Sequence, residues 1–411
     1  MYGISVFFKD LASELGISRA VTSVAAGVGR LEGGITSPLV GWLSDRYGPK
    51  WLIFTGSLIA GCGMILMYFI HSVWSYIVTW GVLIGVGLNI GLTVSVDKSI
   101  NDWFIRKLGL AMGTKFALIG VVGMLLLPTS AWLVSVHGWR ITCLIMGIVM
   151  LILSPLTLIF VRQRRPEYYG LLPDGKTEIH SNSPGTYGMN EKKAYPPPFM
   201  VNEFSLKQAL KTRSYWIICF VYAAQTIVIG AISVHLIPFL TDMGIDRTLA
   251  GGMMGMMVFF TIPSRFFSGI LADRMKKEHL KFLLAGVFFL LATGVLMFTV
   301  FRSMLLMYLM FAIYGLSSGA PTPLLIILTS RYYGRKAFGS INGSSLIIRA
   351  PLALLAPVFA GWVYDKTGNY MIVFYLFVVL LIFGIAFICL ADPPNPEKQP
   401  FDYPHFEKPQ K

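Results

Sequence analysis

Hydrophobic residues occur in long continuous runs that alone predict most of the architecture. A helix needs about 20 apolar residues to cross a bilayer, and charged or turn-rich breaks separate runs of that length. Because the runs do not alternate with polar positions, they favour helices over a barrel. We expect eleven membrane-spanning helices, at 18–43, 51–70, 74–96, 109–135, 140–161, 213–240, 249–272, 281–300, 304–329, 339–364 and 370–391.

The segments outside these runs set the expected organisation. Met1 to Phe8 is an apolar stub, too short to span, that we interpret as the end of a truncated first helix; an upstream start codon would supply its beginning. The only long polar insert is 162–212. We therefore expect an N-terminal bundle of helices 1–6 at 1–161, a central loop at 162–212, a C-terminal bundle of helices 7–12 at 213–391 and a tail at 392–411.

Composition and charge placement agree with a polytopic all-α membrane protein. Only 13% of the 411 residues are charged, against about 25% in soluble domains. If the central loop is cytoplasmic, 24 of the 34 Lys and Arg lie on that side, 6 on the other and 4 within spans, at Arg30, Lys115, Arg265 and Arg349. This bias predicts a multi-pass protein of the cell (inner) membrane with both termini cytoplasmic. The net charge of +14 is then mostly topological, so we expect no nucleic-acid partner.

The chain lacks the sequence patterns of the common catalytic and metal sites. Its four cysteines lie far apart in apolar runs and form no C-x-x-C pair. Neither a P-loop nor a Ser-His-Asp arrangement is visible. We therefore expect no metal, no cofactor, no enzymatic activity and no coupling to ATP within this chain.

Three motifs of the first half return in the second. G-W-L-S-D-R at 41–46 returns as G-I-L-A-D-R at 269–274, W-F-I-R-K at 103–107 as Y-Y-G-R-K at 332–336, and A-W-L-V at 131–134 as G-W-V-Y at 361–364. The three separations agree to within about two residues. Parallel six-helix repeats place a binding site at their interface near the midplane, and rocking of the halves gives alternating access.

These strings also carry a family resemblance. G-W-L-S-D-R-Y-G-P-K at 41–50 resembles the loop 2–3 signature of the major facilitator superfamily. F-F-K-D at 7–10, W-F-I-R-K-L-G-L-A-M-G at 103–113, H-G-W-R at 137–140 and G-W-V-Y-D-K-T-G at 361–368 resemble its monocarboxylate transporter and oxalate/formate antiporter branch. The resemblance implies the major facilitator fold. It also implies a secondary active transporter of lactate, pyruvate, formate, oxalate or similar anions, by proton symport or anion exchange.

Two arginines are the candidate carboxylate ligands. Arg265 lies eight residues before Asp273, about 12 Å from the cytoplasmic end of its helix. An arginine at that depth costs a few kcal/mol to insert, and its planar fork fits a carboxylate. The resemblance places a substrate-binding arginine in this P-S-R-x-x-x-G setting and a second cation at Arg349. For both residues, capping of a helix carbonyl is the structural alternative.

Polar side chains on other helices could complete the site. Asn89 in the fourth helix, Tyr222 in the seventh and Tyr314 in the tenth are hydrogen-bond donors suited to a carboxylate. Packing between helices is the alternative for each.

The proton carrier is open at this stage. Glu32 is the only acid deep in a predicted span, and His235 lies near the outer mouth; each could carry a proton or form a structural hydrogen bond. The resemblance expects an aspartate one turn before Arg265, where this chain has Thr261, and a lysine where it has Tyr2. Anion exchange without proton coupling is therefore a further option.

Charged residues at the helix ends form a candidate cytoplasmic gate. Charges there can pair across two halves in one state and separate in the other; surface solvation is the alternative. The expected members are Asp45, Arg46 and Arg106 in the first half and Asp273 and Arg274 in the second.

Two other functions are compatible with the sequence. Paired arginines also suit a phosphate-like or nitrate-like anion, and competition by lactate, oxalate or formate would discriminate between the two classes. The truncated first helix gives some weight to a non-transporting membrane sensor.

Overall fold

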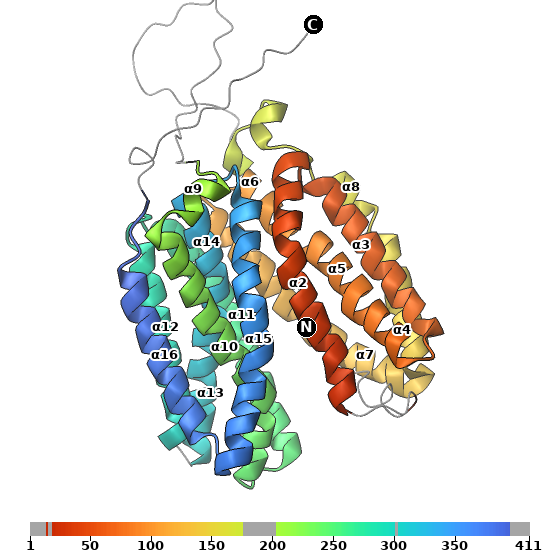
Figure 1. Ribbon diagram of the computed structural model, residues 1–411, viewed down its shortest axis with the longest axis vertical. Coiled ribbons are helices and arrows are strands. Elements are labelled where there is room, and N and C mark those ends of the chain that lie inside the picture. The colour runs from red at the N-terminus through yellow and green to blue at the C-terminus, as the bar shows by residue number, and fades with distance from the viewer. Residues whose placement is uncertain (1–13, 15–18, 176–202, 301–302, 395–411) are drawn as a thin grey trace, which may run out of the picture.

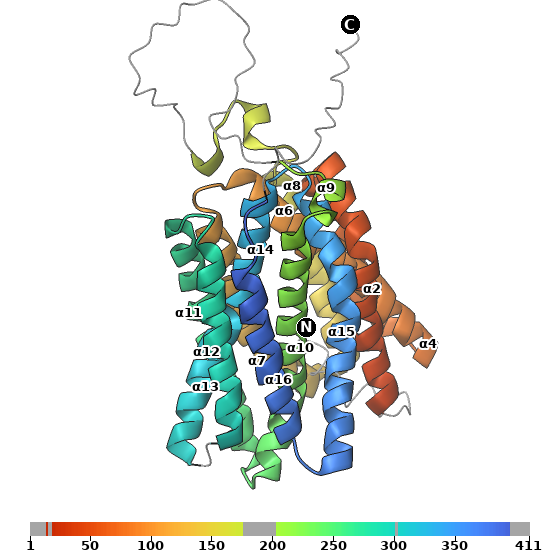
Figure 2. The ribbon, with the colours of Figure 1, turned by 60° about the vertical axis from the view of Figure 1, so that its left-hand side comes forward.

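The computed structural model describes residue 14 and residues 19–175, 203–300 and 303–394. The predicted stub at 1–8, most of the central loop and most of the tail lie outside these residues. The described residues contain no strand. Their long helices run along one common direction (Figure 1, Figure 2).

The first half consists of helices, and its spans depart from regular α-helix in two places. Its elements are α2 (Arg19–Tyr47), α3 (Pro49–Leu66), η1 (Met67–Phe69), α4 (Val73–Tyr76), η2 (Ile77–Ile84), α5 (Gly85–Leu88), η3 (Asn89–Val94), α6 (Ser95–Trp103), α7 (Leu108–Leu153) and α8 (Leu156–Phe160). The segment from α4 to α6 is one continuous span interrupted by two π-helical stretches, η2 and η3. Gly138, with φ +78°, breaks α7 into two helices, because only glycine adopts that conformation without strain.

The connector between the halves is partly helical. It contains η4 (Pro166–Tyr169), η5 (Pro173–Gly175) and α9 (Leu206–Leu210). A capping box begins α9, in which Ser205 and Gln208 satisfy each other's backbone N–H groups.

The second half supplies six further spans from seven helices, because the stretch that contains α13 and α14 forms one span. Its elements are α10 (Arg213–Asp242), α11 (Arg247–Arg274), α12 (Leu280–Val300), α13 (Met304–Gly319), α14 (Pro321–Tyr333), α15 (Phe338–Thr367) and α16 (Met371–Cys389). Nine helical stretches of the described residues are long and apolar enough to cross a membrane. The break at Gly138 divides one of them into two, and α2 adds another. The all-helical fold is thus confirmed, and the described helices can be matched to the eleven predicted spans.

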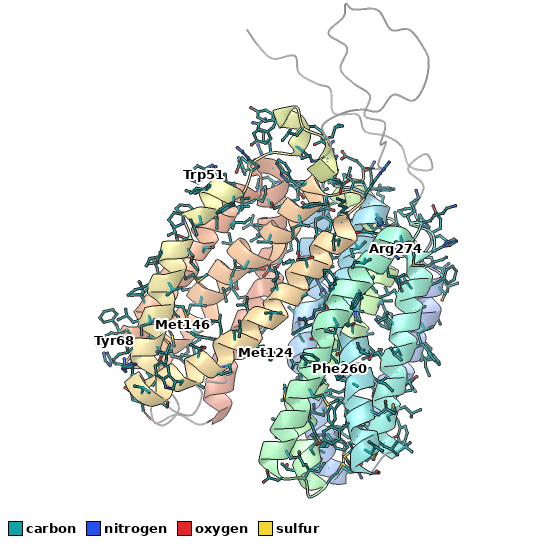
Figure 3. The ribbon with its side chains drawn as sticks, turned by 180° about the vertical axis from the view of Figure 1, so that it is seen from behind. Trp51, Tyr68, Met124, Met146, Phe260 and Arg274 are labelled. Atoms are coloured by element: carbon teal, nitrogen blue, oxygen red, sulfur yellow. The ribbon has the colours of Figure 1, made fainter. Side chains whose placement is uncertain are left out.

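Two helix pairs make most of the contacts between the halves, α2 with α15 (Figure 1) and α7 with α11 (Figure 3). We call the end of the bundle that carries the connector the loop end, and the opposite end the far end. Near the loop end the backbones touch: a Cβ atom on Gly41 would overlap the carbonyl oxygen of Gly339, and one on Gly109 would overlap that of Gly269. Small residues allow this close approach in membrane helices.

Toward the far end the halves separate. A Cβ on Gly120 of α7 would still meet Ile262 of α11 at 2.9 Å, whereas nothing lies within 4 Å of one on Gly123. The next residue, Met124, is 58% exposed. Figure 3 shows α7 at Met124 and α11 at Phe260 diverging from their contact near the loop end. The two halves therefore meet at one end of the bundle and part at the other.

Candidate functional site

At the loop end, Asp45 of α2 reaches across to the second half. Its carboxylate accepts hydrogen bonds from the backbone N–H of Gly339 and Ser340, at 3.0 and 2.7 Å, and from the Ser340 hydroxyl. These N–H groups belong to the first turn of α15, where a negative charge is favoured by the helix dipole. Lys98 lies 3.6 Å from the same carboxylate.

Asp273 makes the corresponding contact in the opposite direction. It lies at the end of α11 and accepts from the backbone N–H of Gly109 and Leu110, in the first turn of α7, both at 2.7 Å. Arg331 of α14 pairs with it at 3.1 Å. The repeated D-R motifs thus form two related interhalf contacts, each a carboxylate on the N-terminus of a helix of the other half.

Further charged groups fill the space between these contacts. Lys98 donates to Asp102 at 2.6 Å and to the carbonyl of Arg335 at 2.7 Å, and Arg335 donates to the carbonyl of Asp102 at 2.8 Å. We call Asp45, Lys98, Asp102, Asp273, Arg331 and Arg335 the loop-end cluster. Its charges are all paired with groups of the same cluster or with backbone.

The connector lies over this cluster. Arg165 contacts Asp102 at 3.3 Å and Glu203 at 3.0 Å, and Arg335 donates to Glu167 at 2.6 Å. Burial would lower the pKa of Arg165, but the carboxylates of Asp102 and Glu203 outweigh it and raise the pKa. Arg165 therefore stays charged and links the connector to the first half.

The other predicted gate residues lie elsewhere. The exposed guanidinium of Arg46 lies over the rings of Trp42 and Tyr47 on its own helix, and Arg274 is also exposed (Figure 3). The backbone N–H of Arg106 donates to Asp174 of the connector. The cations that accompany the two gate aspartates are Lys98 and Arg331.

A second cluster lies deeper in the bundle, and it corrects one prediction. The fourth span was predicted to end at 96, which left Glu32 as the only deep acid. The helix instead continues to Trp103, and Asp97 is only 3% exposed and forms an ion pair with Lys115 of α7. A buried acid is thus available in the first half.

Arg265 joins the halves at the level of this pair. It lies on α11, next to Gly113 of α7, and its Nη1 donates to the carbonyl of Phe116 at 3.2 Å. The contact corresponds to the carbonyl cap considered as the structural alternative. Lys115 is the residue before Phe116 on α7.

Arg349 of α15 is held by its own helix and by an aromatic ring. It contacts Ser345 one turn earlier, and its Cζ lies 3.8 Å from the ring centroid of Tyr222 on α10. The helix that carries Asp97, α6, packs on α15. We call Asp97, Lys115, Arg265, Arg349 and Tyr222 the cationic cluster.

Asn89 and Glu32 belong to a separate network on α2. The Asn89 amide donates to the Thr36 hydroxyl at 2.7 Å and accepts from Ser37 at 3.0 Å. Thr36 in turn donates to Glu32 at 2.7 Å. Asn89 is therefore engaged in packing the fourth span against α2, and the structure does not bring it into direct contact with the cationic cluster.

The remaining candidates lie within the second half. His235 bridges α10 to the Tyr370 hydroxyl at 3.1 Å and to the carbonyl of Pro357 at 2.8 Å. Tyr314 is 1% exposed and packs edge-on against Phe298, at 5.4 Å between centroids. Both arrangements correspond to the packing alternative.

Sequence reasoning missed the acid and the lysine of the fourth span, Asp97 and Lys98. Asp97 and Lys98 lie where hydropathy falls, so hydropathy averaged along the sequence assigns them to a loop although the helix continues. Lys115 was recognised as a cation within a span, but its partner was not. In the described residues, no group of three His, Cys, Asp or Glu could hold a metal ion.

Comparisons with known proteins agree with this architecture. The chain is 24% identical over 379 residues to monocarboxylate transporter 13 of Rattus norvegicus, which covers 92% of this chain and 82% of the relative. It is 28% identical to monocarboxylate transporter 4 of Gallus gallus, over 90% of this chain and 74% of the relative. An uncharacterised transporter of Bacillus subtilis, YcxA, is 24% identical over 91% of this chain and 86% of the relative.

Solved structures share the fold. The crystal structure of FucP, a Major Facilitator Superfamily transporter in the outward conformation, superposes with a TM-score of 0.70 at 12% identity, over 95% of this chain and 94% of that chain. The human organic anion transporter MFSD10 superposes with a TM-score of 0.66 at 14% identity, over 94% and 89%. The family model of the Major Facilitator Superfamily matches residues 1–352. This multi-pass membrane protein therefore belongs to the Major Facilitator Superfamily of transporters.

Proposed function

We propose that this protein is a secondary active transporter of small carboxylates, bound between Arg265 and Arg349. The carrying observation is the cationic cluster, in which three cations, Lys115, Arg265 and Arg349, lie on helices that meet between the halves, together with one acid, Asp97, that pairs with Lys115. Glu32 does not alter the balance, because even with it cations outnumber acids at this depth among the described residues. A buried excess of positive charge favours an anionic ligand, and arginine matches both oxygens of a carboxylate.

The names of the relatives support a carboxylate as that anion, and they include several monocarboxylate transporters. Lactate, pyruvate and formate are monocarboxylates, and oxalate is a dicarboxylate that would engage both arginines. A phosphate-like or nitrate-like anion is the competing ligand class. Adding each of these anions to a transport assay would rank them.

The charge bias supports an orientation with the loop end in the cytoplasm, in the cell membrane. With that orientation the halves meet on the cytoplasmic side and part on the outer side, so this conformation is outward-facing. Alternating access would then require the contacts of Asp45 and Asp273 to break and the far end to close. Substrate would reach the cationic cluster from outside in this state.

The test is counterflow of radiolabelled lactate, formate or oxalate in proteoliposomes. Arg265→Lys keeps the charge but loses the planar fork, so we expect counterflow to fall at least about tenfold, the equivalent of ~1.4 kcal/mol. Arg265→Ala should abolish it. Arg164→Ala, an exposed arginine over Tyr168 in the connector, is the control that should retain activity.

Wild-type rates for Arg265→Ala, with normal insertion, would reject the proposed site. Inhibition by phosphate or nitrate with no effect of carboxylates would reject the proposed substrate class.

A further inference from the structure

The Asp97–Lys115 pair is unusual for its position. Asp97 is 3% exposed, and the side chain of Lys115 is 12% exposed. Removing two charges from water costs several kcal/mol per ion, and apolar residues of similar volume often serve stability as well or better. Ionisable residues inside a membrane helix usually mark a substrate or proton path. The pair therefore calls for an explanation beyond packing.

The pair lies where the first half faces the cations of the second. Lys115 precedes Phe116, whose carbonyl accepts from Arg265. Asp97 lies on α6, which packs on α15, and the guanidinium of Arg349 on α15 covers the Tyr222 ring. A carboxylate bound between the two arginines would thus lie near both members of the pair.

The groups around Asp97 come from each neighbouring helix. Lys115 comes from α7, Arg349 from α15 and Tyr222 from α10. The next residue of α6, Lys98, turns toward the loop end, where Asp102 and Asp45 of α2 engage it. α3 also packs on α6 and carries Lys50 and Cys62 as its titratable residues. Lys115 is thus the group that neutralises Asp97 directly.

We propose that Lys115 is a third substrate-binding cation and that Asp97 is the proton acceptor that couples carboxylate transport to protons, an inference that rests on the proposed function. An arriving carboxylate draws Lys115 away from Asp97. Two carboxylates then share a site of low dielectric, and like charges at short range disfavour a second ionised group. Asp97 therefore takes a proton from the water of the open side.

The cycle balances in charge and in protons. One proton and one carboxylate enter together while Asp97 is neutral and Lys115 holds the substrate. After the halves rock, the substrate leaves, Asp97 releases its proton to the cytoplasmic water, and the pair with Lys115 forms again. The empty carrier thus returns with Asp97 and Lys115 neutralising each other, so this pair adds no uncompensated charge to the step without substrate.

The test separates exchange from proton-driven uptake in proteoliposomes with radiolabelled lactate. Wild type should accumulate lactate faster under an inward proton gradient than without one. In Asp97→Asn the ratio of lactate uptake with and without the gradient should fall to about one, with counterflow measured alongside to show that the variant is active. An undiminished ratio in Asp97→Asn would overturn the proposal.

A double variant distinguishes coupling from a structural role. Asp97→Asn with Lys115→Gln removes both charges and leaves no unpaired ion. A purely structural pair predicts that this variant regains both counterflow and the response to the gradient. We expect it to remain unresponsive to the gradient and to bind lactate more weakly than Asp97→Asn. Lys281→Gln with Asp392→Asn removes an ion pair outside the site and should behave as wild type.

The outcome for the wild type separates this inference from the proposed function. Absence of counterflow with lactate, formate and oxalate would reject the proposed function and this inference with it. Counterflow that is insensitive to the proton gradient would leave the carboxylate transporter standing and reject only the role of Asp97.

Discussion

The two charged clusters of this transporter differ in how their charges are balanced. In the loop-end cluster, Asp45 and Asp273 each receive two backbone N–H groups and a cation, so their charges are matched by fixed partners. In the cationic cluster, three cations accompany Asp97. One arrangement holds helices together, and the other carries an excess of positive charge.

The difference lies in the backbone as much as in the side chains. At the loop end the glycines let helices of the two halves touch, which aims the first turns of α7 and α15 at the aspartates. At the cationic cluster, side chains rather than backbone N–H groups supply the positive charge. Side chains can exchange partners during transport, whereas the capped helix ends must separate as rigid units.

Replacing a glycine of the loop-end contact with a larger residue should have the largest effect. Gly109→Val places a branched side chain against the backbone of Gly269, where even a Cβ overlaps the carbonyl. The halves can then no longer meet at the loop end, and we expect the outward-facing population and transport to be lost. Pulsed electron paramagnetic resonance between spin labels at Met124→Cys and Phe259→Cys should report a shorter distance across the far end.

The control lies on the same helix. A Cβ on Gly123 meets nothing within 4 Å, so Gly123→Ala should leave the distance and the transport rate close to those of the parent chain. The measurement uses a parent in which the four native cysteines have been replaced. An unchanged distance in Gly109→Val would show that the contact does not determine which end is closed.

The two helix-capping aspartates offer a finer comparison. Asp273→Asn leaves Arg331 with the carbonyl of Met275, whereas Asp45→Asn leaves Lys98 with Asp102 and the carbonyl of Arg335. Loss of a charged cap costs about 1–2 kcal/mol, which changes a population ratio by roughly 5–30-fold. We expect Asp273→Asn to reduce the outward-facing population more than Asp45→Asn.

The same spin-label pair measures this ranking. Equal shifts for the two variants would show that the remaining partners of Lys98 and Arg331 do not matter. Arg46→Ala, at an exposed residue next to Asp45, tests whether any change of charge at this end has the same effect; we expect none from it.

The sequence predicted the fold far better than the contacts of the site. Hydropathy and the repeated motifs located the eleven spans and both aspartates of the loop-end cluster, because length and spacing are local properties. The partners were not predictable in the same way. Arg46 and Arg106 follow the motifs in sequence, but the cations that reach Asp45 and Asp273 are Lys98 and Arg331, brought there by helices distant in the chain.

Asp97 shows the limit of hydropathy most clearly. Its surroundings, S-V-D-K-S-I-N-D-W, have the low hydropathy of a loop, yet the helix continues and buries four charged residues or amides on one face. Burial there depends on neighbours from α7 and α15, which no local window contains. The positions of Arg265 and Arg349 were predictable because a lone arginine in an apolar run is conspicuous.

The connector provides the smallest expected effect and tests whether the loop-end cluster acts alone. Asp174 accepts from the backbone N–H groups of Ile105, Arg106 and Lys107, just before α7, and it is the only described non-glycine residue with positive φ, at 64°. Glycine adopts positive φ readily, so Asp174→Gly preserves this backbone conformation but removes the side-chain acceptor. Asparagine tolerates positive φ as well, so Asp174→Asn preserves the conformation and keeps an acceptor.

We expect Asp174→Gly to reduce the outward-facing population by no more than about fivefold, the equivalent of ~1 kcal/mol, and Asp174→Asn to reduce it less. The effect is small because the same helix end keeps its contact with Asp273. A loss in Asp174→Gly as large as that in Asp273→Asn would mean that the connector, and not the loop-end cluster alone, holds the two halves together.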